Sequence, residues 1–473
     1  MSNTKSYVGI AGKIVIIGFG SISKGVIPLI VKHIDISPER ILVISPEITE
    51  NEYALELGIQ FKCVSLTQNN FREFLTPLLN SGDFLLNLSV GVASVALIEI
   101  CQEQGALYLD TCIEPWEGNY VNETLTLSER SNYALREDAL QLKSKFIGGS
   151  TAVLTHGANP GLVSHFVKQA LINLSVEQGT YIGDPENQYA WAELAWSLGI
   201  KTIHIAERDT QRSFLPKNHN EFVNTWSVNG FVSEGCQPSE LGWGTHERHW
   251  PEIAMRHDFG RGSSIYLMKP GATVRVNTWT PTGGQCQGFI ITHNESISIA
   301  DYLTIFDNDA LAYRPTVHYA YHPCDDAILS LHELAGRNWV KQRHMRILNQ
   351  EIRPGGFDEL GVLLMGHKNS TYWFGSTLSI DEARTLACCN NATSLQVAAG
   401  VLGGMVWAIE NPNSGVVEPD EMNYKRVLEV ASQYLGKMSG YYTDWTPLSS
   451  RSSLFPTKMD DSDPWQFCNF VAA

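Results

Sequence analysis

The stretch Lys13-Ile-Val-Ile-Ile-Gly-Phe-Gly-Ser-Ile-Ser23 decides the fold of the N-terminal part of the chain. Lys13–Ile17 is a short run rich in β-branched residues, which predicts a buried strand. Two glycines, Gly18 and Gly20, end this run, and from Ser23 to about His33 the apolar residues fall at helical spacing. A strand that passes through two glycines into a helix is typical of the first unit of a doubly wound parallel sheet.

The turn from this strand into the helix has the residues that a pyrophosphate needs. Gly18 allows the tight turn, and Gly20 lets the backbone approach phosphate groups with no Cβ in the way. The helix that follows directs its N–H groups and the positive end of its dipole at the same point. Ser23 holds the position of the third glycine of the usual motif, which a small residue tolerates. Strand, loop and helix together predict a dinucleotide-binding site.

Further apolar runs continue the pattern along the chain. Ile41-Leu-Val-Ile44, Phe84-Leu-Leu-Asn-Leu88 and Ala106-Leu-Tyr-Leu109 are predicted strands, and Ala96–Gln104 is a predicted helix. Near-continuous apolar strands alternate with helices where a parallel sheet is covered on both faces. We therefore expect an α/β fold with a Rossmann-type, doubly wound parallel sheet over residues 1–160.

The end of the second strand favours NAD over NADP. Ser45 holds the position that is usually acidic, and Glu47 follows two residues later. No arginine or lysine lies between Val43 and Lys62 to receive a 2′-phosphate. A carboxylate repels that phosphate and can accept a hydrogen bond from the ribose hydroxyl.

The other strand ends face the same crevice, because doubly wound sheets bind ligands outside the carboxyl ends of their strands. Glu114 and Trp116 follow one of these ends, and the pattern alone supports a site role and a surface role for Glu114 equally. The residues expected to bind the cofactor are Gly18, Phe19, Gly20, Ser21, Ile22, Ser45, Glu47, Ser89, Val90, Asp110 and Thr111.

The composition changes after the turn His156-Gly-Ala-Asn-Pro-Gly161. Leu162–Leu174 predicts a helix, and the chain then becomes richer in aromatic residues, glycine and proline. Alternating patterns such as Ile203–Ala206 and Thr273–Trp279 predict strands. We expect a second, mixed α+β domain over residues 161–390 that binds the substrate and contributes to a dimer interface.

Two helical stretches, Leu395–Ile409 and Glu421–Leu435, follow this domain. We expect residues 391–473 to form a helical C-terminal segment that packs back on the nucleotide-binding domain. Its last part, after Pro447, is rich in serine and aspartate and is expected to be irregular.

Asn229-Gly230 lies between two strand-like patterns and predicts a β-hairpin with a type I′ turn. A carboxylate near an indole would bind an ammonium group by ion pairing and by cation–π attraction. With a two-residue turn, however, Glu234 pairs with Thr225, on the opposite face from Trp226. The spacing alone therefore favours a core tryptophan and a solvated glutamate.

Charge and composition exclude several classes of protein. A formal net charge of −16 argues against a nucleic-acid partner and is compatible with a cationic substrate. The sequence contains no run of eighteen apolar residues, so we expect no membrane span. The N-terminus lacks the pattern of a signal peptide. The nine cysteines form no CxxC pair, and the histidines form no metal-binding cluster. We expect a metal-free protein in a reduced, cytoplasmic compartment.

Several motifs, taken in order, resemble those of the bacterial homospermidine synthases, in the saccharopine-dehydrogenase-like group. They are Gly-Phe-Gly-Ser-Ile, Asp-Thr-Cys-Ile-Glu-Pro-Trp, His-Gly-Ala-Asn-Pro-Gly-Leu-Val-Ser-His-Phe, Ala-Glu-Arg-Asp and Asn-Thr-Trp-Ser-Val. The resemblance covers nearly the whole chain, and the Ala-Glu-Arg-Asp and Thr-Trp-Ser-Val segments are the ones most specific to the synthases.

This resemblance implies an enzyme that transfers an aminobutyl group with NAD as a retained cofactor. Its substrate would be putrescine, or spermidine as the donor, and its partners would be diamines and polyamines. Glu114, Glu207 and Glu234 would bind the diamines, and Trp226 would hold the cationic intermediate. The remaining residues that the resemblance implies are Asn159 and His293 near the nicotinamide, Pro160 at the cofactor, and, with weaker support, Glu295 and Asp358.

Two alternatives stay open. One is a saccharopine- or carboxyspermidine-dehydrogenase-like NAD(P)-dependent reductase, whose carboxylate substrates arginines would bind in a bidentate manner. Arg208, Arg275 and Arg353 are among the arginines that could serve. The other is a nucleotide sensor without catalysis, which would not need repeated pairs of glutamate and tryptophan.

Overall fold

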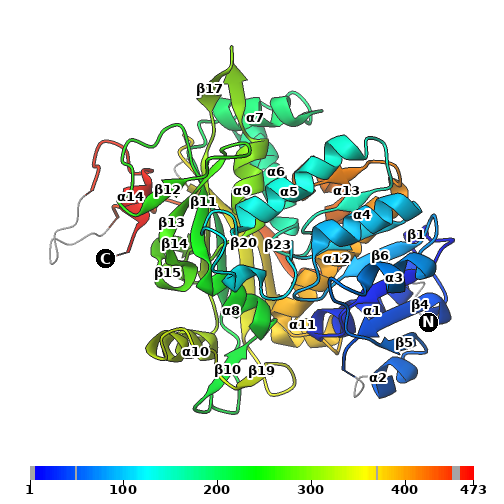
Figure 1. Ribbon diagram of the computed structural model, residues 1–473. Helices are drawn as coiled ribbons and strands as arrows, with labels where there is room; N and C mark the ends of the chain where they lie inside the picture. The colour runs from blue at the N-terminus through cyan, green and yellow to red at the C-terminus, as the bar shows by residue number, and fades with distance from the viewer. Residues whose placement is uncertain (1–5, 48–50, 369–370, 450–458, 473) are drawn as a thin grey trace. The chain divides into compact units, whose positions relative to one another are not determined.

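The computed structural model describes the chain except for residues 1–5, 48–50, 369–370, 450–458 and 473 (Figure 1). It forms two compact units. Unit 1 consists of Met1–Arg130, Ala134–Leu162 and Glu382–Leu435, and unit 2 of Ser131–Tyr133, Val163–Asp381 and Gly436–Ala473.

The C-terminal segment predicted over 391–473 is therefore divided at Leu435. Its first part belongs to unit 1 and its last part to unit 2. The reason lies in backbone pairing, because β23 (Lys437–Thr443) forms an antiparallel ladder with β21 (Thr371–Ser379).

Unit 1 contains a parallel sheet of seven strands in the order β22-β8-β7-β6-β2-β4-β5. The strands are β2 (Ile14–Ile17), β4 (Ile41–Ser45), β5 (Gln60–Cys63), β6 (Phe84–Asn87), β7 (Leu107–Asp110), β8 (Ala152–Val153) and β22 (Val416–Val417). All residues of β2, β4, β6 and β7 are buried, as their apolar sequences predict. The predicted doubly wound sheet is confirmed, and the order reverses at β2, between β4 and β6.

The helices of this part of the chain are α1 (Ser21–His33), α2 (Asn51–Glu56), α3 (Phe71–Leu75), α4 (Ser94–Gln104), α5 (Asn132–Lys145), α12 (Ala392–Glu410) and α13 (Tyr424–Ala431). Two further short strands, β1 (Val8–Gly9) before β2 and β3 (Ile34–Asp35) directly after α1, pair in parallel with each other. In Figure 1 the orange α12 lies against the blue α1 and beside α13.

Helix α12 is apolar on all sides. It is long and apolar enough to cross a membrane, but 89% of its most apolar 18-residue stretch is buried inside the protein. Gly400 and Gly404 lie where a Cβ would overlap with the backbone of Gly157 and the ring of His156. We therefore interpret α12 as a core helix, since a helix that is hydrophobic all round belongs either in a protein core or in a membrane.

Unit 2 contains a ten-stranded mixed sheet. Its main path is β12-β13-β11-β18-β9-β20-β21-β23, and β15 joins β14 to β18. Only β18 and β9 are parallel among the pairs of this sheet in the described residues, so the predicted mixed α+β architecture is confirmed. The strands not yet given are β9 (Thr202–Asp209), β11 (Pro238–Gly242), β12 (Ala254–Arg256), β13 (Ser264–Pro270), β14 (Arg275–Thr280), β15 (Gly284–Phe289), β18 (Thr316–His322) and β20 (Phe357–Met365).

Two small strand pairs accompany this sheet, β10 (Glu221–Asn224) with β19 (His344–Ile347), and β16 (Ile305–Asp307) with β17 (Ala310–Tyr313). The helices of this part are α6 (Leu162–Glu177), α7 (Gln188–Ser197), α8 (Val228–Cys236), α9 (Asn294–Tyr302), α10 (Asp325–Gly336) and α14 (Phe467–Phe470). Helix α11 (Ile380–Leu386) begins in unit 2, but most of its residues belong to unit 1.

The predicted hairpin around Asn229-Gly230 is wrong. Strand β10 ends at Asn224, and α8 begins at Val228. Ser227 caps the helix, because its hydroxyl accepts a hydrogen bond from the N–H of Gly230 at 3.1 Å. The N-cap serine and the burial of residues three apart, Val228 and Phe231, outweigh the turn preference of the Asn-Gly pair.

Candidate active site

The phosphate loop of unit 1 leaves its backbone open to a ligand. Gly18 has a φ of +92°, and a Cβ there would lie 2.7 Å from the carbonyl oxygen of Leu88, so glycine is required. Gly20 directly precedes α1, and among the described residues no atom lies within 4 Å of the position of its Cβ. The hydroxyl of Ser23 donates a hydrogen bond to the carbonyl of Gly18 at 2.7 Å and holds the turn. The open side at Gly20 fits a pyrophosphate at a helix N-terminus.

Gly25, within α1, is also tightly packed. A Cβ on Gly25 would overlap with the side chain of Asn390, whose Nδ2 donates to the carbonyl of Gly25 at 3.3 Å. No local pattern predicts this contact, because the two residues lie 365 positions apart.

The second strand ends as an NAD site requires. Ser45 is buried at the end of β4, and Glu47 is exposed two residues later. The ring of Phe19 packs against Tyr53 and Phe61, with centroids 5.9 and 6.0 Å apart. The exposed Glu47 carboxylate can accept a hydrogen bond from a ribose hydroxyl.

Polar side chains at the ends of β6 and β7 bind groups of unit 1 itself. Oδ1 of Asn87 accepts hydrogen bonds from the backbone N–H and the hydroxyl of Ser89 at 3.2 and 2.6 Å. Asp110 accepts from the N–H of Thr155 at 2.6 Å and from the hydroxyl of Tyr108 at 2.7 Å. Burial raises the pKa of Asp110 to about 6. The other residues predicted near the cofactor, all in unit 1, are Ser21, Ile22, Val90, Thr111, Asn159 and Pro160.

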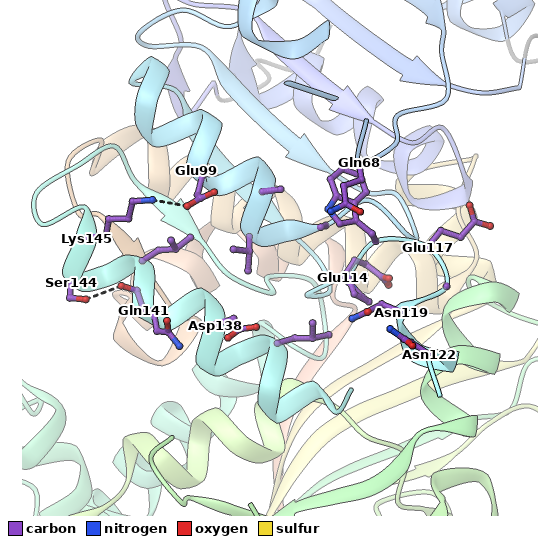
Figure 2. Close-up of a pocket in the computed structure, with 18 residues that line it drawn as sticks. Gln68, Glu99, Glu114, Glu117, Asn119, Asn122, Asp138, Gln141, Ser144 and Lys145 are labelled. Carbon is purple, nitrogen blue, oxygen red and sulfur yellow. Dashed lines mark hydrogen bonds and ion pairs between the residues drawn. The ribbon is translucent and has the colours of Figure 1, made fainter. Parts of the chain in front are cut away.

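Glu114 lines a cavity of about 1120 Å³ in unit 1 (Figure 2). Its side chain is buried, and Oε2 accepts a hydrogen bond from the N–H of Gly91 at 3.2 Å. Figure 2 shows Glu114 with Glu117 and Asn119 at one end of the cavity, and the ion pair of Lys145 with Glu99 at the other. The cavity is thus acidic around Glu114.

Glu207 lies near the end of β9 and is only 3% exposed. Its Oε2 accepts a short hydrogen bond from the hydroxyl of Tyr319, on the neighbouring strand β18. The ring of Tyr319 stacks on that of Tyr321, with centroids 5.1 Å apart and an angle of 6°.

Trp226 follows β10 and is partly exposed, so it is not the core residue that its spacing favours. Its Nε1 donates a hydrogen bond to the hydroxyl of Tyr321 at 3.1 Å. Its ring lies 5.3 Å from Phe231, measured between centroids, and Phe231 lies 5.7 Å from Tyr321. The indole is therefore held at its nitrogen and along one side.

His293 lies between two carboxylates. Its Nε2 is 3.0 Å from Oε2 of Glu234, and its Nδ1 is 3.2 Å from Oε1 of Glu295. Burial alone would lower the pKa of His293, but the negative charges of Glu234 and Glu295 outweigh it and raise that pKa well above its usual value. His293 is therefore an imidazolium at neutral pH. Glu234 is also not the solvated residue that the spacing favours, because its side chain is only 12% exposed.

Asp358 lies directly opposite Asp209 where β20 pairs with β9, and both side chains are buried. Asp209 accepts a hydrogen bond from the hydroxyl of Thr225 at 2.7 Å. Burial raises the pKa of Asp209 to about 6.

The structure thus connects the predicted residues of unit 2. Glu207, Glu234 and Trp226 belong to one network, because the ring of Tyr319 lies 4.5 Å from that of His293, measured between centroids, and stacks on Tyr321. Tyr319, Tyr321 and Asp209 were not predicted. The alternation in His318-Tyr-Ala-Tyr-His322 was the available signal for the two tyrosines, since alternate residues of a strand share a face.

Comparisons with known proteins agree along the whole chain. The family model of the saccharopine dehydrogenase NADP binding domain matches residues 14–153, and that of the saccharopine dehydrogenase C-terminal domain matches residues 157–444. The homospermidine synthase of Blastochloris viridis is 53% identical over 475 residues, which cover 100% of this chain and 99% of that protein. The homospermidine synthase of Mesorhizobium japonicum is 50% identical, with 99% and 98% covered.

Solved structures show the same relationship. The homospermidine synthase of Legionella pneumophila in complex with NAD is 48% identical, with a TM-score of 0.93 and 100% of both chains covered. The apo saccharopine dehydrogenase of Saccharomyces cerevisiae, at 10% identity and a TM-score of 0.50 over 92% of this chain and 100% of that one, shows the fold alone. The chain therefore belongs to the homospermidine synthase family.

Proposed function

We propose that this protein is an NAD-dependent homospermidine synthase that transfers an aminobutyl group from putrescine, or from spermidine, to putrescine. The observation that supports this most is the network of Glu207, Trp226 and the Glu234–His293–Glu295 triad within unit 2. A diamine is a flexible dication, and carboxylates beside an aromatic wall are the groups that recognise it.

NAD is the cofactor that fits this chain. The open backbone at Gly20 receives the pyrophosphate, and the exposed Glu47 disfavours a 2′-phosphate. The Legionella relative, whose structure contains NAD, supports this choice. When bound, NAD takes up a hydride from the amine and later returns it, so no net oxidation occurs.

The side chains of unit 2 have distinct tasks in this scheme. Oxidation requires a neutral amine, so a carboxylate must first take its proton, and Glu207 is the candidate for this step. His293 is already protonated, and its task is to hold the carboxylates of Glu234 and Glu295 in place. In this proposal the indole face of Trp226 stabilises the iminium carbon as positive charge develops.

The atoms and electrons balance over the cycle. Putrescine loses a hydride and a proton to become an iminium ion. The amine of a second putrescine attacks this carbon, and ammonia leaves, or 1,3-diaminopropane leaves if spermidine was the donor. The returned hydride reduces the new iminium to the secondary amine of homospermidine. Exclusion of bulk water prevents hydrolysis of the iminium to an aldehyde.

Deuterated putrescine tests the proposal. We expect the purified protein with NAD to convert putrescine labelled at both aminomethyl carbons to homospermidine that retains all its deuterium, even with unlabelled NADH in solution. Mass spectrometry of the product, with ammonia release and absorbance at the NADH band, gives the measurement. Accumulation of free NADH, or deuterium lost to the NADH pool, would instead indicate a reductase that exchanges its cofactor.

A homodimeric state and a cytoplasmic location belong to the same proposal and rest on the likeness to the bacterial family. Sedimentation and cell fractionation test them directly.

A further inference from the structure

We propose that Asp209 is a positioning residue, which fixes the indole of Trp226 through the hydroxyl of Thr225. The inference rests on the proposed function, in which Trp226 contacts the cationic intermediate. Its basis is a single contact, the hydrogen bond that Oγ1 of Thr225 donates to Oδ2 of Asp209 at 2.7 Å. Thr225 is fully buried and directly precedes Trp226 in the chain.

The carboxylate of Asp209 is itself rigidly held. Its Oδ1 accepts hydrogen bonds from the backbone N–H of Gln211 at 2.8 Å and from Nε2 of the same residue at 3.1 Å. Asp209 is the last residue of β9, a strand with a neighbour on each side. The acceptor for Thr225 therefore has one fixed orientation, set by the central part of the sheet.

The segment that carries Trp226 needs such an anchor. Strand β10 ends at Asn224 and α8 begins at Val228, so Thr225 and Trp226 belong to neither element. Because neither a strand ladder nor a helix includes these two residues, side-chain hydrogen bonds contribute directly to where the segment lies.

Two hydrogen bonds then hold Trp226 from opposite ends. Thr225 ties the backbone beside it to Asp209, and Tyr321 binds the indole Nε1 at 3.1 Å. Tyr321 belongs to β18, which pairs with β9, so both anchors lie on adjacent strands of one sheet. A cation–π contact depends on the position of the ring face, and loss of either anchor leaves that position less defined.

Substitutions at Thr225 and Asp209 test this arrangement. Thr225→Val keeps the side-chain shape and removes the donor, Asp209→Ala removes the acceptor, and Thr225→Ser retains the donor. Thr371→Val is the matched control, because buried Thr371 donates a comparable hydrogen bond to the carbonyl of Trp445 at 3.0 Å. Full-length protein is labelled with fluorotryptophan, and the Trp226 resonance is assigned by its absence in a Trp226→Phe variant.

We expect Thr225→Val and Asp209→Ala to shift or broaden the Trp226 resonance. They should also lower kcat/KM for putrescine by about tenfold, as expected for one hydrogen bond to a charged group. NAD affinity should stay as in Thr371→Val, and Thr225→Ser should recover most of the loss seen in Thr225→Val. The double variant Asp209→Ala/Thr225→Val should be no worse than Asp209→Ala alone, because both changes break the same contact.

An unchanged Trp226 resonance and an unchanged kcat/KM in Thr225→Val, relative to Thr371→Val, would overturn the inference. Thr225→Val decides the matter even if Asp209→Ala fails to fold. Should the wild-type protein make no homospermidine, the proposed function fails, and the fluorine resonance alone then decides whether Asp209 positions the indole.

Discussion

At the scale of single residues, His293 owes its positive charge to its neighbours. Glu234 and Glu295 hold it as an imidazolium despite its burial. Because its pKa in the folded state is raised, its stabilising effect is complete below the unfolded pKa of about 6.5. The effect is lost as the pH rises through the higher folded pKa.

We predict that His293→Gln lowers the free energy of unfolding by about 3 kcal/mol at pH 6, the cost of removing one partner from a buried ion pair. The difference from wild type should shrink as the pH rises above about 6.5. Denaturant unfolding over a series of pH values measures it. A difference that stays constant across the series would mean that His293 is neutral in the folded protein.

Trp226 allows a sharper test at the same scale. Trp226→Ala should lower kcat/KM for putrescine by at least about tenfold, since a desolvated cation–π contact contributes roughly 2 kcal/mol. Trp226→Phe should lose less, because phenylalanine keeps a weaker aromatic face. NAD affinity, measured by calorimetry, should be unchanged in both. Full turnover by Trp226→Ala would remove the indole from the mechanism.

The sequence predicted most of these residues but not their contacts. Glu207, Glu234 and His293 were named through the resemblance to the synthases, while spacing alone placed Glu234 and Trp226 on opposite faces. Tyr319 and Asp209 were missed, because their roles depend on the pairing of β9 with β18 and β20, and local sequence does not specify the register of distant strands.

At the scale of elements, the two glycines of the phosphate loop have different roles, one in the stability of the fold and one in ligand binding. Gly18 contributes to the stability of the fold, since its φ is +92° and a Cβ would meet Leu88. Gly20 has open space at its Cβ position, so only a ligand requires it to be glycine.

Gly20→Ala should therefore leave the melting temperature of the NAD-free protein nearly unchanged and weaken NAD binding by about tenfold or more. Gly18→Ala should lower the melting temperature by several degrees, in line with about 1–3 kcal/mol of backbone strain and overlap. Thermal unfolding with and without NAD separates the two effects. Tight NAD binding by Gly20→Ala would show that the pyrophosphate does not lie against this residue.

Element prediction succeeded where the apolar residues were nearly continuous and failed where local preferences competed. Strands β2, β4, β6 and β7 and helix α12 follow from unbroken apolar patterns. The hairpin predicted at Asn229-Gly230 was wrong, because these two residues are compatible both with a tight β-turn and with the first turn of a capped helix. Burial of Phe231 in unit 2 settles the choice, and burial is not visible in the sequence.

For the whole molecule, the division of the C-terminal segment at Leu435 has a measurable effect. A chain that ends at Leu435 keeps all of unit 1 but lacks β23, which pairs with β21 of unit 2. We expect this truncated protein to bind NAD with near-wild-type affinity and to lose homospermidine formation. Calorimetry and product analysis test this, and a truncated protein with full turnover would contradict it.

Helix α12 and strand β22 complete unit 1 from residues 382–435, where β22 pairs with β8 and α12 contacts α1, β7 and β8. The phosphate loop (Gly18–Ser23) is therefore translated long before α12 (Ala392–Glu410), the core helix of the same unit. The core of unit 1 therefore stays incomplete, without α12, until nearly all of unit 2 has been synthesised. The residues proposed to bind the pyrophosphate are thus translated before residues 163–381 of unit 2, and the helix that completes their own core is translated after them.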